Sequence, residues 1–112
     1  MSDERNIKDG AWAWMNKAAL EKIRTRCEDA KSSLGVYLAL CEIASDHKSQ
    51  SFMVSMDKIA SKCCLSRRTV LDRLNDLEFI GLVEITRSKT SENFRIPSAY
   101  LLLRCEFMEG VK

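Results

Sequence analysis

The sequence contains few residues of the kinds that interrupt regular structure or build chemical sites. Its 112 residues include one proline, four glycines and one histidine. There is no glycine-rich phosphate loop, and no nucleophile, base and acid stand at a suggestive spacing. No apolar run approaches the roughly 20 residues of a membrane helix, and the acidic first residues are unlike a secretion signal. We therefore expect a cytoplasmic protein that is neither an enzyme nor a membrane protein.

The cysteines are odd in number and lack the spacing of a metal site. None of the five stands in a C-x-x-C pair, and the adjacent Cys63 and Cys64 are poorly placed to bridge each other. Small reduced thiols pack as hydrophobic side chains inside cytoplasmic domains. We expect no metal, no cofactor and no disulfide framework. The five are Cys27, Cys41, Cys63, Cys64 and Cys105.

Charge is nearly balanced in total but unevenly distributed. The 18 basic and 16 acidic residues leave a net charge of +2, and the first 50 residues are neutral. From Lys58 to Arg73, by contrast, the only acidic residue is Asp72. A second basic cluster, of Arg87, Lys89 and Arg95, outnumbers Glu92. Local basic clusters of this kind are typical of surfaces that contact nucleic acid, although a solvated helix face is the plainer alternative.

Residues 55–83 predict a short helix, a tight turn, a longer helix and a strand. Ser55 and Ser66 are suitable N-caps for the two helices, and residues 63–65 form the turn between them. The second helix is predicted from Ser66 to Ile80, and Gly81 suits its end. Its apolar stripe, which faces the core, consists of Val70, Leu74 and Leu77. The strand follows in residues 82–87.

The rest of the chain predicts two helices before this unit and a hairpin after it. A helix capped by Asn16 is expected over residues 17–30, and its apolar stripe suits either the core or a homodimer contact. Ser33 is expected to cap the next helix, with Leu34, Tyr37, Leu38 and Cys41 as its buried stripe. Residues 46–51 read as a polar loop. Pro97 cannot donate a ladder hydrogen bond, so the return strand is expected to be short or at a sheet edge.

Several of these segments carry a family resemblance. They are Ile59-Ala60, residues 65–70 and 77–83, with Trp14-Met15 and residues 34–40 upstream. There the chain resembles the winged helix-turn-helix domains of phage and plasmid replication proteins, and more loosely those of bacterial transcription regulators. The resemblance implies a mostly α fold with a small β-hairpin (α+β), in one domain over residues 11–105. Residues 1–10 are expected to be disordered and residues 106–112 to form a tail.

The resemblance and the basic clusters together imply sequence-specific binding of double-stranded DNA. The helix from Ser66 would lie in the major groove, with Arg67 and Arg68 facing either guanine or phosphate. The remaining contacts are expected to be to the backbone or from the wing. The full predicted set is Lys58, Lys62, Ser66, Arg67, Arg68, Thr69, Arg73, Arg87, Lys89 and Arg95.

Two features depart from this pattern. Leu71 is apolar and Asp72 acidic, where such a recognition helix usually has polar or basic residues. Cys64 stands where such turns often have glycine, so a left-handed backbone there would cost roughly 1 kcal/mol. The biological role stays open between a replication initiator module and a transcription regulator, each with possible protein partners. The alternative function is a protein–protein adaptor that uses an apolar patch formed by Leu71, Phe79 and Ile80.

Overall fold

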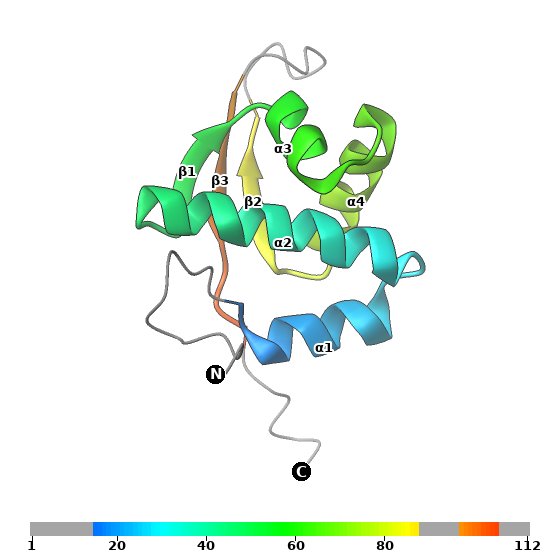
Figure 1. Cartoon of the computed structure of the whole chain (residues 1–112). Coiled ribbons are helices and arrows are strands. Elements are labelled where there is room, and N and C mark those ends of the chain that lie inside the picture. Colours follow the sequence, from blue (N-terminus) through cyan, green and yellow to red (C-terminus); the bar gives the residue numbers. More distant parts are fainter. Residues whose placement is uncertain (1–14, 88–96, 106–112) are drawn as a thin grey trace, which may run out of the picture.

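The protein folds as four helices and a three-stranded antiparallel sheet (Figure 1). The computed structural model describes residues 15–87 and 97–105. The elements are α1 (Lys17–Arg26), α2 (Ala30–His47), β1 (Ser51–Val54), α3 (Met56–Cys63), α4 (Arg67–Phe79), β2 (Val83–Thr86) and β3 (Ser98–Leu102). α2 crosses the sheet, with α1 on one side of it and α3 and α4 on the other. The predicted α+β winged helix-turn-helix fold is confirmed.

The boundary between the first two helices differs from the prediction. Asn16 caps α1 as expected and accepts a hydrogen bond from the Ala18 backbone N at 2.7 Å. However, α1 ends at Arg26, because Cys27 is already extended. Asp29, and not Ser33, caps α2 by accepting from the Ser32 backbone N at 3.1 Å. The carboxylate is the better cap at the positive end of a helix.

The predicted helix–turn–helix unit is confirmed nearly residue by residue. Ser55 caps α3 and Ser66 caps α4, each accepting from the backbone N–H three residues on. Cys64, at the turn position where glycine is common, lies in the left-handed region with φ 58°. Gly81 has φ 82° and ends the α4 segment, where a residue with a Cβ would be strained.

The sheet contains one strand that the sequence prediction missed. Residues 46–51 are not simply a loop: α2 continues to His47, and Ser51 begins β1. β1 pairs with β3, which also pairs with β2, so the strand order is β1-β3-β2. The return strand is therefore central and not at an edge. Pro97 does not prevent this, because it precedes the first paired residue, Ser98.

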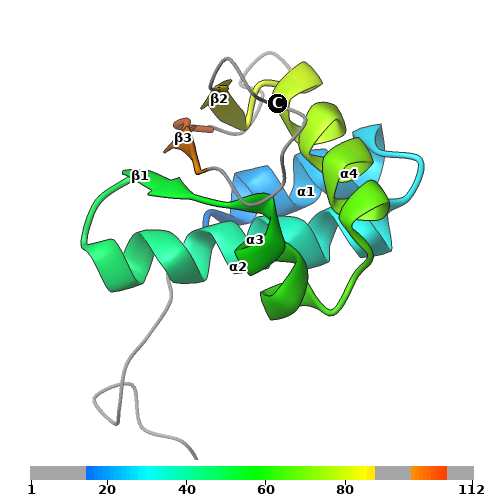
Figure 2. The ribbon, with the colours of Figure 1, turned by 90° about the horizontal axis from the view of Figure 1, so that it is seen from above.

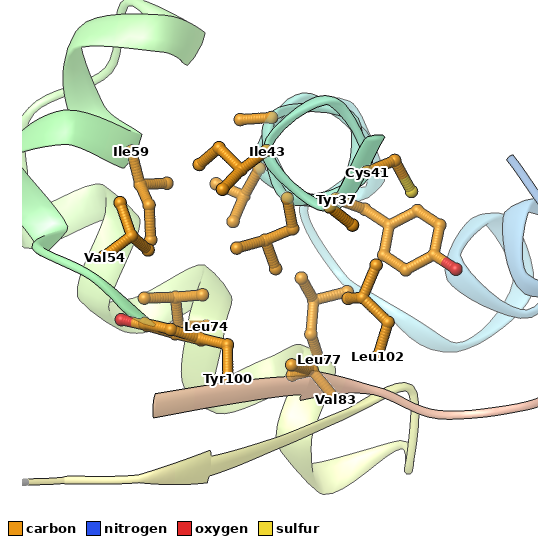
Figure 3. Close-up of a cluster of buried hydrophobic side chains, with 14 of the residues drawn as sticks. Tyr37, Cys41, Ile43, Val54, Ile59, Leu74, Leu77, Val83, Tyr100 and Leu102 are labelled. Carbon is orange, nitrogen blue, oxygen red and sulfur yellow. The ribbon is translucent and has the colours of Figure 1, made fainter. Parts of the chain in front are cut away.

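One core joins all the elements. Figure 3 shows side chains of α2 facing β3, with Ile59, Val54 and Leu74 closing the same interior. The stripe of α1 packs into this core through the buried Ile23, so the core alternative predicted for it is the one observed. Leu38 was predicted to be buried in α2, but it is 49% exposed. Because Val36, Leu40 and Ile43 face the interior, the helix turns Leu38 outward.

Some predictions concern residues outside the described ranges. These are the disorder of residues 1–10, most of the wing loop with Lys89 and Arg95, and the tail of residues 106–112. Among the residues that are described, no helix is long and apolar enough to cross a membrane.

Candidate nucleic-acid interface

The turn between α3 and α4 projects from the side of the molecule away from the strands (Figure 2). It places the first two residues of α4, Arg67 and Arg68, at the surface, with side chains 56% and 81% exposed. The buried stripe of α4 faces the core and thereby fixes which side of the helix is outward. The N-terminal turn of α4 is thus an exposed basic end, which is the part of a recognition helix nearest the base edges.

Arg67 is held by an acidic residue of the preceding helix. Its Nε lies 2.5 Å from Oδ1 of Asp57, and its Nη2 lies 3.3 Å from Oδ2. The two groups therefore meet in a two-point contact that joins the first turn of α3 to the first turn of α4. Arg68 makes a looser contact with Asp72, one helical turn along, at 3.6 Å. The two neighbouring arginines are constrained to very different degrees.

The lysines of α3 differ in the same way. Lys62 lies 3.3 Å from Glu42 of α2 and is only 24% exposed in its side chain. Lys58, one turn earlier on α3, is exposed, and no ion pair joins it to another residue within the described ranges. Lys58 therefore adds an available positive charge next to Asp57, whereas Lys62 is shared with α2.

The hydroxyl groups of Ser66 and Thr69 satisfy each other at the start of α4. The Ser66 hydroxyl donates to Thr69 Oγ1 at 2.9 Å and accepts from the Thr69 backbone N at 3.2 Å. This arrangement caps the helix and keeps both oxygens at the surface edge of the turn. Both residues lie beside the basic end of α4, while their contact with DNA remains a prediction.

Arg73 lies in a more enclosed environment than Arg67 and Arg68. Its side chain is 19% exposed. Nη1 donates to Oδ2 of Asp29 at 3.0 Å, and Nε lies 3.0 Å from Asp76. Hydrogen bonds from Ser32 and the charge of Arg73 lower the pKa of Asp29. Arg73 joins the start of α2 to the middle of α4, and a DNA contact from it stays a prediction.

Arg87 stands where β2 leaves the sheet toward the predicted wing. Its guanidinium donates to Oε1 of Glu78 at 3.3 Å and to Oδ1 of Asn75 at 2.9 Å. Both partners belong to α4, so this arginine joins the end of β2 to α4. The other two wing residues of the predicted set, Lys89 and Arg95, lie outside the described ranges.

Ser66, Arg67, Arg68 and Thr69 thus lie together at the start of α4, and Arg67 joins this helix to α3 through Asp57. Lys62, Arg73 and Arg87 also have carboxylate partners on other elements, and Lys58 is exposed on α3. Asp57, the partner of Arg67, is absent from the set of residues predicted from the sequence. The available signal was its position: Asp57 and Arg67 both stand in the first turn of their helices, on either side of a tight turn.

The apolar residues of the alternative patch are not equivalent. Leu71 and Ile80 are partly buried and pack against the core. Phe79, at the end of α4, is 91% exposed. No group of three or more metal-ligating side chains is found in the part of the chain that the structure describes.

The comparison with protein families agrees with this geometry. Residues 31–83 match the model of a helix-turn-helix domain, and the match extends from the first turn of α2 to the start of β2. It therefore includes α3, the turn and α4 in full. Searches of curated proteins and of solved structures gave no match to this chain. The family match supports a DNA-binding domain of the helix-turn-helix type.

Proposed function

We propose that this helix-turn-helix domain binds double-stranded DNA in a sequence-specific manner, with the N-terminal turn of α4 in the major groove. The observation that carries the proposal is the exposed basic end formed by Arg67 and Arg68 at the start of α4. Lys58 extends this charge onto α3, and Ser66 and Thr69 offer hydroxyl groups beside it. Arginine donors at the start of such a helix suit both phosphate oxygens and base edges.

The proposed biological role is that of a replication initiator module or a transcription regulator. What supports it is the winged helix-turn-helix architecture, in which β2 and β3 flank the predicted wing beside α4. Both roles require a domain that finds a particular DNA site, and the proposal assigns no catalytic step to the domain itself.

One observation favours a second function, that of a protein–protein adaptor. Phe79 is 91% exposed, the largest exposed fraction among the large apolar side chains of the described residues, and a protein partner could cover it. Phe79 lies at the opposite end of α4 from Arg67 and Arg68. An adaptor surface at Phe79 would therefore leave the basic end of α4 accessible, so the two functions are separable by mutation.

The first experiment is a titration of labelled random-sequence duplex DNA with the protein, followed by fluorescence anisotropy at several salt concentrations. Because about −0.9 in the logarithmic salt slope corresponds to one neutralised phosphate, a slope of about −2 to −4 is expected from the basic end of α4. Arg68→Ala should weaken binding at low salt, whereas Phe79→Ser should not. Absence of binding by the wild-type protein at low salt would refute the proposal and favour the adaptor.

A further inference from the structure

We infer that Arg67 reads a guanine and that Asp57 is the residue that positions it to do so, while Arg68 contacts phosphate. This assignment rests on the proposed DNA binding and adds the identity of one base. The sequence alone treats the two arginines as equivalent. The structure separates them, because only one of them is held in a two-point contact with another helix.

The contact with Asp57 defines the orientation of the Arg67 guanidinium. A guanidinium is planar, with five N–H donors in a fixed fork. Nε and Nη2 of Arg67 form one edge of the guanidinium, and this edge contacts the Asp57 carboxylate. The other edge, at which Nη1 and Nη2 carry two parallel N–H bonds, consequently points away from Asp57. The residue sits in the first turn of α4, the part of the helix that approaches the base edges.

Two parallel donors at that spacing match the major-groove edge of guanine. Guanine presents O6 and N7 as neighbouring acceptors, whereas adenine presents one acceptor and one donor there. An arginine that approaches end-on therefore distinguishes the two purines. The negative charge of Asp57 also disfavours a phosphate next to it, which directs Arg67 toward the bases and away from the backbone.

Fixing the arginine before binding increases discrimination. A long side chain that is already ordered loses less conformational freedom on binding than one that must be ordered at that moment. Arg68 has no comparable support: its contact with Asp72 is longer, and the side chain is 81% exposed. A mobile, exposed arginine adapts to the irregular positions of phosphates and carries no base information. The two roles follow from this difference in constraint.

The test is a selection from random duplexes followed by a comparison of matched variants. The wild-type protein should enrich guanine at one position of its site. Replacing that guanine with 7-deazaguanine, which lacks the N7 acceptor, should weaken binding about tenfold, within the range for losing a bidentate base contact. Asp57→Asn should reduce this tenfold difference to about twofold, and Arg67→Lys should do the same, because a lysine cannot present two parallel donors.

Asp72→Asn is the matched control. It removes one negative charge beside a neighbouring arginine of the same helix, as Asp57→Asn does. Both variants should bind random duplex as tightly as the wild type or more tightly, but only Asp57→Asn should lose the preference for guanine. Arg68→Lys should keep the preference. Circular dichroism and thermal unfolding of each variant check that the fold is retained.

The possible results distinguish a failure of the guanine assignment from a failure of the proposed DNA binding. If the wild type binds DNA without a guanine preference, or if Asp57→Asn retains the preference, the assignment of Asp57 and Arg67 is overturned while DNA binding stands. If the wild type binds no DNA at all, both proposals fall. Loss of the preference in Asp57→Asn but not in Asp72→Asn is the result expected here.

Discussion

At the scale of single residues, Cys64 is the clearest local conflict between sequence and backbone. Its φ of 58° and ψ of 38° place it in the left-handed region, and its side chain is exposed at the end of α3. For an L-residue with a Cβ, this conformation costs about 1–2 kcal/mol of folding free energy. Glycine avoids this steric cost. However, glycine loses more conformational freedom on folding, which offsets about 0.5–1 kcal/mol of the stabilisation.

Cys64→Gly is therefore expected to stabilise the protein by about 0.5–1 kcal/mol, which corresponds to a rise in Tm of about 2–4 °C. Cys64→Val should lower Tm, because a branched Cβ tolerates this conformation poorly. Thermal unfolding under reducing conditions measures both. The matched control is Cys63→Gly, in the last helical residue of α3, which should cost about 1 kcal/mol. A Cys64→Gly variant that melts below the wild type would contradict the strain argument.

Single residues also show how far the candidate site was predictable. The caps Ser55 and Ser66 and the stop at Gly81 were identified from sequence because each is a local rule involving neighbouring residues. The pairing of Asp57 with Arg67 was not, because it depends on how two helices are oriented across the turn. The same reason explains Arg73, whose partner Asp29 is 44 residues away.

At the scale of elements, Arg73 connects α2 to α4 from a largely buried position. It is the only one of the predicted DNA contacts within the described ranges that two carboxylates, from Asp29 and Asp76, approach at 3.0 Å. Replacing it with methionine keeps most of the apolar stem but leaves those carboxylates without their cation. Exposed ion pairs contribute little to stability, whereas breaking a fully buried pair is strongly destabilising. The effect of breaking this half-buried network is expected to lie between the two.

Arg73→Met is expected to lower the unfolding free energy by about 1–2 kcal/mol, measured by urea denaturation. Well below its Tm, the variant should bind DNA with an unchanged salt slope if the arginine only joins the two helices. A slope smaller in magnitude by about 1 would instead show that Arg73 contacts a phosphate, as the sequence predicted. Lys31→Met, an exposed change on α2 with the same loss of charge, is the control for stability.

The elements differ in how well the sequence predicted them. α3 and α4 have strong caps and a clear 3.6-residue stripe, so their bounds followed from local patterns. β1 has only four residues and follows a polar run, and its stability comes from pairing with β3 almost 50 positions later. Short strands defined by distant partners carry little local signal. The wing side of the sheet was predicted because Gly81 and an apolar run mark it.

At the scale of the whole molecule, the small net charge of +2 is accompanied by ion pairs at most of the predicted DNA contacts. The predicted contacts Lys62, Arg67, Arg68, Arg73 and Arg87 each have a carboxylate within 4.0 Å, so the positive charge is neutralised locally over much of the surface. Of the predicted contacts within residues 15–87, Lys58 is the one basic residue for which no ion pair is found. We therefore expect few phosphate contacts, and a specificity that depends on the orientation of those few side chains more than on total charge.

The buried core also determines how the molecule responds to alkaline pH. Burial raises the pKa of Cys41 from 9.0 to about 11, and that of Tyr100 from 10.0 to about 12. Burial likewise raises the pKa of Tyr37, which lies against Cys41. Each group is harder to ionise in the folded protein than in the unfolded chain. Their contribution to stability is complete below the unfolded values and is lost as the pH rises through the folded values.

The unfolding free energy should therefore be constant near pH 8 and fall from about pH 9 upward. Between its unfolded and folded pKa values each group contributes a slope of about 1.4 kcal/mol per pH unit. Cys41 acts first, since its ordinary pKa is the lower one. Urea denaturation at pH 8, 9, 10 and 10.5, in the presence of a reductant, measures this decline as a shift of the midpoint.

Cys41→Ala isolates the thiol from the tyrosines. The variant is less stable at every pH, because it leaves a small void in the core, but the slope is what tests the argument. Between pH 9 and 10 its unfolding free energy should decline less steeply than that of the wild type, by up to about 1.4 kcal/mol per pH unit. Cys64→Ala, which removes an exposed thiol, is the matched control for the loss of a cysteine. Identical slopes for Cys41→Ala and the wild type would mean that the Cys41 thiol ionises equally readily in the folded and unfolded chains, so that burial between α2 and the sheet does not protect it.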